Sequence, residues 1–156
     1  MNQKNYSMKN LIYFCISLLI FSCTNETMVT KNSDSKAVTF IIDLAVNPDS
    51  KIEDLTQFTK EITANVLEKE DFCLEYGYYI SEDKTSITLY EKYIDSESAL
   101  KHAQSFREGD FFDKFFKLFA PNKFIITGPV SDEFKEFASE NGFVIDYRNS
   151  IDGFVR

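Results

Sequence analysis

The 156-residue chain contains no tryptophan, one histidine, three cysteines, five glycines and three prolines. So few Cys and His residues, with no Cys-x-x-Cys pair, argue against a Cys/His zinc cluster. The scarcity of Gly and Pro disfavours repeat-rich and linker-rich architectures. Lys and Arg number 17 against 25 Asp and Glu, for a net charge of −8. A basic surface for nucleic acid is therefore not expected. The GxSxG, Walker A, GxGxxG and HExxH motifs are also missing from the sequence.

The N-terminus has the layout of a signal peptide. Residues 1–10 carry two lysines and no acid, and Leu11–Ser22 is an uncharged apolar run of 12 residues. Such a run would form a helix of about 18 Å, which is short for a bilayer core of roughly 30 Å. The run ends in Ile20-Phe21-Ser22-Cys23, which resembles the lipobox of bacterial lipoproteins. This resemblance implies cleavage before Cys23 and attachment of lipid to its thiol.

Three segments follow from this interpretation. They are a signal peptide over residues 1–22, a flexible polar tether over 23–36 that begins at lipidated Cys23, and a domain over 37–156. The domain would then be anchored by lipid to a membrane of the cell envelope, outside the cytoplasm. An ordinary secretory signal or an uncleaved signal anchor are the alternatives, and Met8 is an alternative start. After cleavage, Cys73 would be the remaining free thiol, so no intramolecular disulfide is expected.

The domain alternates predicted strands and helices. Apolar residues recur with a helical period in two segments and with strand-like patterns in the segments around them. Strands are predicted over 37–46, 73–81, 85–94, 122–130 and 143–147, and helices over 52–70, 96–106, 111–119 and 131–141. The order is β-α-β-β-α-β followed by an appended α-β. We therefore expect an α+β, ferredoxin-like antiparallel sheet with helices on one face. Its other face would need cover, which a second copy could supply.

Several short motifs recur in the order typical of one family. They are Glu70-Asp71-Phe72-Cys73-Leu74-Glu75-Tyr76, Tyr90-Glu91-Lys92-Tyr93-Ile94-Asp95, Ala99 with His102, and Gly128-Pro129-Val130-Ser131. This pattern resembles the antibiotic biosynthesis monooxygenase family of the dimeric α+β barrel superfamily, from about Val38 to Arg156. The resemblance implies a homodimer, and a cofactor-independent monooxygenase or quinol-type oxidase that needs neither metal nor flavin. A base would remove a proton from a small polyphenol or quinol, and the resulting anion would reduce O₂.

His102 and Glu91 are the predicted catalytic residues. An imidazole titrates near 6.5, the range that a general base requires. His102 shares a helix face with Ala99 and Phe106, so it should point toward the sheet. The alternative is a core or surface histidine that is merely hydrogen-bonded. Glu91 shares strand parity with apolar neighbours, so it is either a pocket carboxyl or the partner of a basic group across an interface.

Aromatic residues supply the predicted substrate-binding site. Its members are Tyr76, Tyr78, Tyr79, Tyr93, Phe112 and Phe116. The tyrosine hydroxyls could hold a phenol or quinone, and the phenylalanines could cover an apolar cavity. The alternative is that Tyr simply suits sheets and that Phe forms ordinary core. Cys73 is expected to be packed rather than reactive. Two other functions remain open: a haem-handling protein with His102 as axial ligand, and a non-catalytic ligand-binding lipoprotein.

Overall fold

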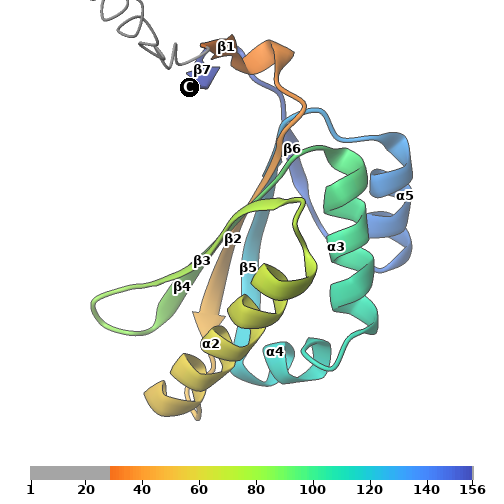
Figure 1. Cartoon of the computed structure of the whole chain (residues 1–156). Helices are drawn as coiled ribbons and strands as arrows, with labels where there is room; N and C mark the ends of the chain where they lie inside the picture. The colour runs from red at the N-terminus through yellow and green to blue at the C-terminus, as the bar shows by residue number, and fades with distance from the viewer. Residues whose placement is uncertain (1–28, 156) are drawn as a thin grey trace, which may run out of the picture.

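The computed structural model describes residues 29–155 (Figure 1). The predicted signal peptide, Cys23 and the first part of the predicted tether lie outside these residues. Within residues 29–155, none of the helices combines the length and apolar character needed to cross a membrane.

The domain is built on one five-stranded sheet. Its strands are β2 (Val38–Val46), β3 (Cys73–Ile80), β4 (Ser86–Tyr93), β5 (Phe119–Thr127) and β6 (Asp146–Arg148). They lie in the order β3-β4-β2-β5-β6. All neighbours are antiparallel except β5 and β6, which are parallel. The first four strands have the ferredoxin-like arrangement that the sequence predicts, and β6 extends the sheet at one edge.

Four helices cover one face of this sheet, as Figure 1 shows. They are α2 (Ile52–Lys69), α3 (Ser96–Glu108), α4 (Phe112–Leu118) and α5 (Asp132–Glu140). Local sequence explains where the helices begin. The Asp95 carboxylate accepts a hydrogen bond of 2.9 Å from the Ser98 N–H at the start of α3. The Ser131 hydroxyl accepts one of 3.2 Å from the Phe134 N–H at the start of α5. Both are N-caps, which satisfy amide donors that have no partner inside the helix.

The core lies between the helices and the inner face of the sheet. Alternate residues of β2 and β4 point into it, with Val38, Phe40 and Leu44 from β2 all buried. From the helical side, Leu55, Phe58, Ile62 and Val66 of α2 are buried at helical spacing. The buried residues form two clusters, one under α3 and α5 and one under α2 and α4. The space between these clusters is where the cavity described below lies.

Strands β5 and β6 differ from the predicted bounds. Strand β5 begins at Phe119 rather than at Asn122, and it contains Pro121. The β2–β5 register shifts between Asp43 and Leu44, next to Pro121. A shift of this kind accommodates a residue that has no N–H to donate to the ladder. Strand β6 begins three residues later than predicted, because residues 143–145 line the cavity and pairing with β5 starts at Asp146.

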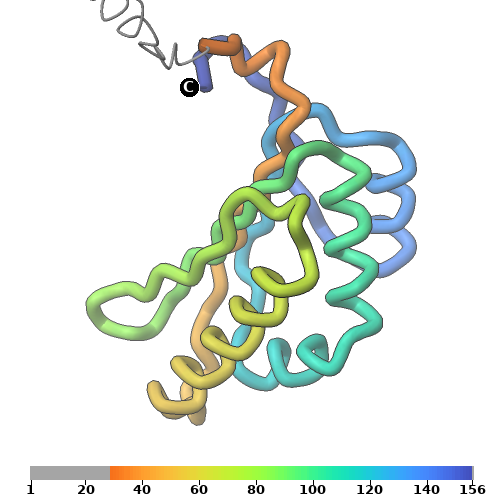
Figure 2. The backbone as a smooth tube through the Cα atoms, viewed as in Figure 1, coloured from red at the N-terminus to blue at the C-terminus, as the bar shows by residue number. Residues whose placement is uncertain are grey.

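The ends of the described chain pair with each other. Strand β1 (Thr30–Lys31) and the short 3₁₀ helix η1 (Asn32–Asp34) lie in the predicted tether. Strand β1 pairs antiparallel with β7 (Phe154–Val155), in the part predicted as a tail. Figure 2 shows these two ends side by side at one pole of the domain. Part of the tether segment and the tail is thus regular structure rather than flexible chain.

Candidate functional site

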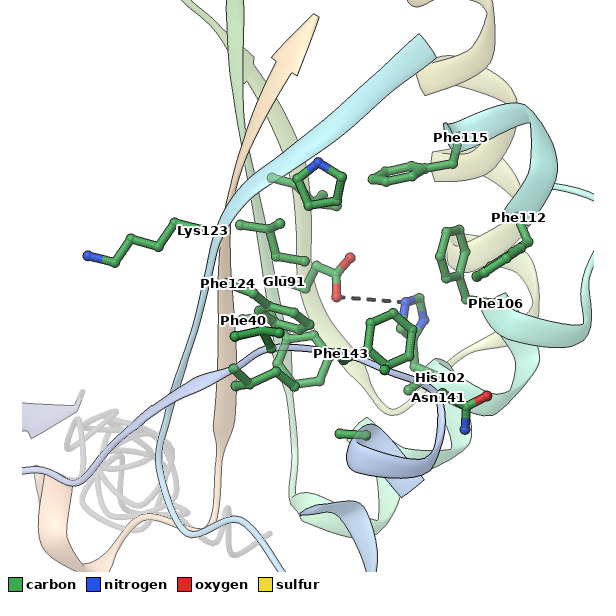
Figure 3. A pocket seen from close by; sticks show the side chains of 18 of the residues that line it. Phe40, Glu91, His102, Phe106, Phe112, Phe115, Lys123, Phe124, Asn141 and Phe143 are labelled. Atoms are coloured by element: carbon green, nitrogen blue, oxygen red, sulfur yellow. Dashed lines mark ion pairs between the residues drawn. The ribbon is translucent and has the colours of Figure 1, made fainter. Parts of the chain in front are cut away.

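A cavity of about 610 Å³ lies between the helices and the inner face of the sheet (Figure 3). Volumes of 300–1,000 Å³ are usual for sites that bind small molecules. Aromatic residues dominate its walls: Phe40, Phe106, Phe112, Phe115, Phe116, Phe124, Phe134, Phe137 and Phe143. Polar groups converge at the wall formed by β3, β4 and α3, where Tyr76, Tyr78, Glu91 and His102 meet. Asn122, Asn141 and Asp146 line the part formed by β5 and the segment from α5 to β6, whereas the side chain of Lys123 points away from the cavity (Figure 3).

His102 projects from α3 toward the sheet, as the helical spacing predicts. It is 5% exposed, and its two ring nitrogens face two different carboxyl groups. Nδ1 lies 2.8 Å from Glu70 Oε2. Nε2 lies 3.7 Å from Glu91 Oε2, the pair drawn as a dashed line in Figure 3. The ring also stacks with Phe106 one turn along the helix, at 6° between planes.

Glu91 lies on the inner face of β4, between Leu89 and Tyr93, and is 3% exposed. The Tyr93 hydroxyl donates a hydrogen bond of 2.9 Å to Glu91 Oε2. The carboxyl therefore contacts one donor from its own strand and one imidazole from α3. Of the two sequence interpretations, the pocket carboxyl fits this position, because Glu91 lines the cavity beside His102.

Electrostatics couple these groups. Burial raises the pKa of Glu91, and the nearby His102 and the Tyr93 hydroxyl offset part of that rise. Burial lowers the pKa of His102, but the carboxyl groups of Glu91 and Glu70 outweigh it, so this pKa lies above its usual value. Both groups hold their protons more tightly than they would in water. The buried imidazole and the two carboxyl groups beside it therefore titrate as a coupled set.

The predicted tyrosines divide between the two faces of the sheet. Tyr76 and Tyr78 line the cavity, and their hydroxyl oxygens are 3.2 Å apart. Burial raises the pKa of both phenols, so they stay neutral and can donate or accept hydrogen bonds. Tyr93 is fully buried and reaches the site through Glu91. Tyr79 is 57% exposed and pairs with Thr88 on the opposite face, so the structure does not bring it to the cavity.

Phe112 and Phe116 lie on α4 and line the cavity, as the sequence suggests. Their ring centroids are 4.8 Å apart, and Phe116 remains 39% exposed. Phe115 of the same helix is buried against Phe119 and Phe58. The Phe-rich segment thus combines the two interpretations, core packing and cavity lining, because one side of α4 fills the core and another side borders the cavity.

The sequence prediction missed Glu70 as a site residue. It is the C-cap residue directly after α2, and its buried side chain reaches His102 across 32 positions of sequence. Its place just before a β-prone segment was visible in the sequence, but its partner on α3 was not. Cys73 is half-buried, and burial raises its pKa to about 11. That value indicates a packed thiol rather than a reactive one. Within residues 29–155, no group of three or more His, Cys, Asp or Glu side chains could hold a metal ion.

Comparison with known proteins finds similarity to solved structures but not to family models or curated sequences. No protein-family model matches the sequence, and a search of curated proteins found no match. Among solved structures, MupZ from Pseudomonas fluorescens superposes with a TM-score of 0.60 at 18% identity, over 78% of this chain and 96% of that one. A conserved protein from Bacteroides thetaiotaomicron, described as a possible oxidoreductase, gives a TM-score of 0.50 at 17% identity, over 59% and 96%.

A protein from Caulobacter crescentus, described as a candidate antibiotic biosynthesis monooxygenase, gives 0.47 at 18% identity, over 59% of this chain and 86% of that one. The described domain shares the fold of MupZ, an α+β fold with helices on one face of an antiparallel sheet. Identities this low establish the fold alone, and one fold supports many activities. What the domain does must therefore be argued from its own cavity.

Proposed function

We propose that this protein is a cofactor-independent monooxygenase or quinol-type oxidase that acts on a small aromatic substrate. The observation that carries the proposal is the pairing of buried His102 and Glu91 at the polar end of a phenylalanine-lined cavity. A general base must lie within reach of the proton that it removes and must titrate near the working pH. His102 lies in the cavity wall, and the carboxyl groups beside it raise its pKa above the usual value, which makes the neutral ring a stronger base.

The cavity favours a ligand with an apolar aromatic body and a polar group at one end. The phenylalanine walls would enclose the rings, and offset or edge-to-face contacts with such rings add to simple burial. Hydroxyls of Tyr76 and Tyr78, together with His102 and Glu91, would hold a phenolic oxygen. An apolar enclosure also limits the water that reaches an electron-rich anion before it meets oxygen.

The reaction balances with O₂ as the only other reactant. In the oxygenase form, the base removes a proton from an activated CH₂ group, and the carbanion adds O₂ to give a peroxide anion. The imidazolium returns the proton to that anion, which makes a hydroperoxide. Loss of the second C–H proton and cleavage of the O–O bond then give a carbonyl and one water. In the oxidase form, a quinol passes two electrons and two protons to O₂, which yields a quinone and hydrogen peroxide.

Oxygen uptake by the purified domain with a panel of quinols and polyphenols, with and without a metal chelator, tests the proposal. We expect uptake that the chelator leaves unchanged. His102→Gln should reduce it by roughly 100-fold or more, the usual contribution of general base catalysis. Lys101→Gln is the matched control, because Lys101 is next in sequence but is exposed and forms an i,i+4 ion pair with the exposed Glu97. A folded His102→Gln protein with full turnover would overturn the role of the base.

Two further measurements on the same purified domain, ligand binding and haem absorbance, separate the alternatives. Ligand binding without oxygen uptake would indicate a non-catalytic binding protein on this scaffold. A Soret band that shifts when haem is added would indicate a haem-handling protein, with His102 as the axial ligand.

We also propose that the protein is a lipoprotein of the cell envelope, with Cys23 as the lipidated residue and the domain outside the cytoplasm. The support is the charged N-terminus, the 12-residue apolar run and the cysteine directly after it. Metabolic labelling with a radioactive fatty acid in a bacterial host should mark the wild-type chain. Cys23→Ala should abolish the label, and Cys73→Ala should not. Equal labelling of the Cys23→Ala protein would refute the assignment.

The homodimer is a further part of the proposal. The helices leave the outer face of the sheet without a covering layer, and the half-buried Ile41, Tyr90 and Ile125 lie side by side at its centre. Face-to-face packing of two sheets would bury these residues. Sedimentation of the purified domain should give the mass of a dimer, and Ile41→Glu should give a monomer. Glu97→Lys, on the exposed side of α3, should leave the dimer intact. A monomeric wild-type protein would contradict this part.

A further inference from the structure

One imidazole lies between two carboxyl groups, and the two contacts are unequal. Glu70 Oε2 is 2.8 Å from Nδ1, which is the length of a strong, charge-assisted hydrogen bond. Glu91 Oε2 is 3.7 Å from Nε2, which is too long for a direct hydrogen bond. All three side chains are at most 9% exposed. The single proton of the neutral ring can sit on Nδ1 or on Nε2. In a buried site it favours Nδ1, where it makes the shorter hydrogen bond, because leaving a buried carboxylate without that hydrogen bond is costly.

The backbone fixes Glu70 in this place. Its N–H donates a hydrogen bond of 2.9 Å to the carbonyl of Val66, which closes the last turn of α2. Its own carbonyl accepts one of 3.0 Å from the Cys73 N–H, where β3 begins. The residue is thus held by the helix on one side and by the strand on the other. A side chain supported in this way can orient another group with little motion of its own.

We infer that Glu70 is a positioning residue, which keeps a proton on Nδ1 of His102 and so leaves Nε2 as the atom that gains and loses a proton on the cavity side. Glu91 then faces Nε2, the nitrogen that titrates, and does not compete for the proton that stays on Nδ1. This inference rests on the proposed function only in the use of Nε2 as the base. The protonation state of the ring itself can be tested without any substrate.

The surroundings of the His102 ring place Glu70 on the side that faces away from the cavity. A groove between α2 and α3 is also lined by His102 and Phe106, which therefore separate it from the cavity. Glu70 lines this groove and not the cavity. The other charged groups along the groove are Lys69, Lys101, Glu108 and Asp110. On the sheet side, the titratable groups near the ring are Glu91, Tyr93 and Tyr76. Glu70 is thus the contact of the ring on its groove side, while Glu91 is its contact on the cavity side.

Nitrogen NMR measures the tautomer directly, and the single histidine of the chain makes the assignment unambiguous. With ¹⁵N-labelled protein, two-bond correlations from the ring protons are followed through the titration of His102. We expect the neutral form of the wild type to carry its proton on Nδ1. In Glu70→Ala, Glu91 is the remaining carboxyl, so the proton should move to Nε2. Glu91→Gln is the matched control, and it should leave the proton on Nδ1.

Chemical rescue provides a second readout. Truncation at position 70 opens space toward the groove, so added formate should restore the Nδ1–H form of Glu70→Ala but leave Glu91→Gln unchanged. With a substrate that supports uptake, Glu70→Ala should lose roughly 100-fold or more in kcat, and formate should recover part of it. Glu70→Asp should keep the wild-type tautomer if the shorter carboxylate still reaches the ring.

The outcomes separate this inference from the proposed function. A neutral wild-type ring protonated on Nε2, or a folded Glu70→Ala protein that keeps Nδ1–H, would overturn the role of Glu70, whatever the oxygen uptake. The expected tautomers without uptake on any substrate would leave the positioning role standing and remove the enzymatic one. Should Glu70→Ala fail to fold, the wild-type and Glu91→Gln spectra decide, since both must show Nδ1–H.

Discussion

Two alanines on α3 offer a sharp test of the cavity. Ala103 is half-buried and lines the cavity, whereas Ala99, one turn earlier, is fully buried in the core and lines no part of it. Replacing each with leucine adds the same three carbons to the same helix. Helix propensity and sequence context are therefore matched, and the two variants differ in what the new side chain meets.

The expected effects have opposite signs. At position 103, three added carbons enter apolar space at about 0.8 kcal/mol each, and leucine loses about 0.5–1 kcal/mol of side-chain entropy. The net is a stabilisation of about 1.4–1.9 kcal/mol. At position 99 there is no room, and overpacking a filled core typically costs about 1–3 kcal/mol. The two proteins should therefore differ by about 3 kcal/mol in the free energy of unfolding.

Thermal unfolding followed by circular dichroism can resolve this difference. A domain of this size shifts by about 4 °C per kcal/mol, so the two midpoints should lie about 12 °C apart, with Ala103→Leu the higher. Ala103→Leu should also weaken ligand binding, because it fills space that the ligand needs. If Ala103→Leu is destabilised as much as Ala99→Leu, the cavity is not open in solution, and the substrate site proposed above would lose its basis.

Further outcomes follow from the same structure. Oxygen uptake should rise with pH through a midpoint above about 6.5, since Glu91 and Glu70 raise the pKa of His102 despite its burial; a midpoint below that value would contradict this. The raised pKa means that the folded state binds this proton more tightly than the unfolded state does. Its stabilisation is therefore present below about pH 6.5 and is lost as the pH rises through the folded value, and His102→Gln should flatten this part of the urea-unfolding profile. Gly128→Ala should cost about 1–3 kcal/mol, because its φ is +106° and a Cβ would lie 2.3 Å from the Ala37 carbonyl oxygen; Gly142→Ala, with φ +74° and open space around it, should cost less. Cys73 should react slowly with a thiol reagent at pH 8 in the native state and quickly in urea, because its pKa is about 11; equal rates would refute its packing.

Much of the fold could be read from local pattern. The apolar spacing in residues 52–70 predicted α2 to within one residue of its end at Lys69. The caps at Asp95 and Ser131 marked the starts of α3 and α5, because capping chemistry depends on a few adjacent residues. Strand parity likewise placed Glu91 among buried neighbours on β4.

The errors lie where distant segments decide the structure. The stretch from Phe119 to Pro121 looks like a helix end followed by a break, and only its pairing with β2 makes it strand. The β1–β7 pairing joins two segments of two residues each, Thr30–Lys31 and Phe154–Val155, which are too short to show a strand pattern. Tyr79 is a different case, since simple alternation from Tyr76 and Tyr78 already assigns it to the opposite face. Glu70 could not be assigned to the site locally, because its role requires the end of α2 to meet the middle of α3.

The pairing of β1 with β7 makes the described chain nearly a closed ring. Thr30 and Val155 are direct partners although they are 125 positions apart (155 − 30), and such partners lie about 5 Å from each other. A short connection could therefore span these two ends. A circular permutant could join these ends and open instead at Lys84, in the turn between β3 and β4 (Figure 1). A group attached to that new N-terminus would hold the domain by its hairpin, at the opposite pole from β1 and β7.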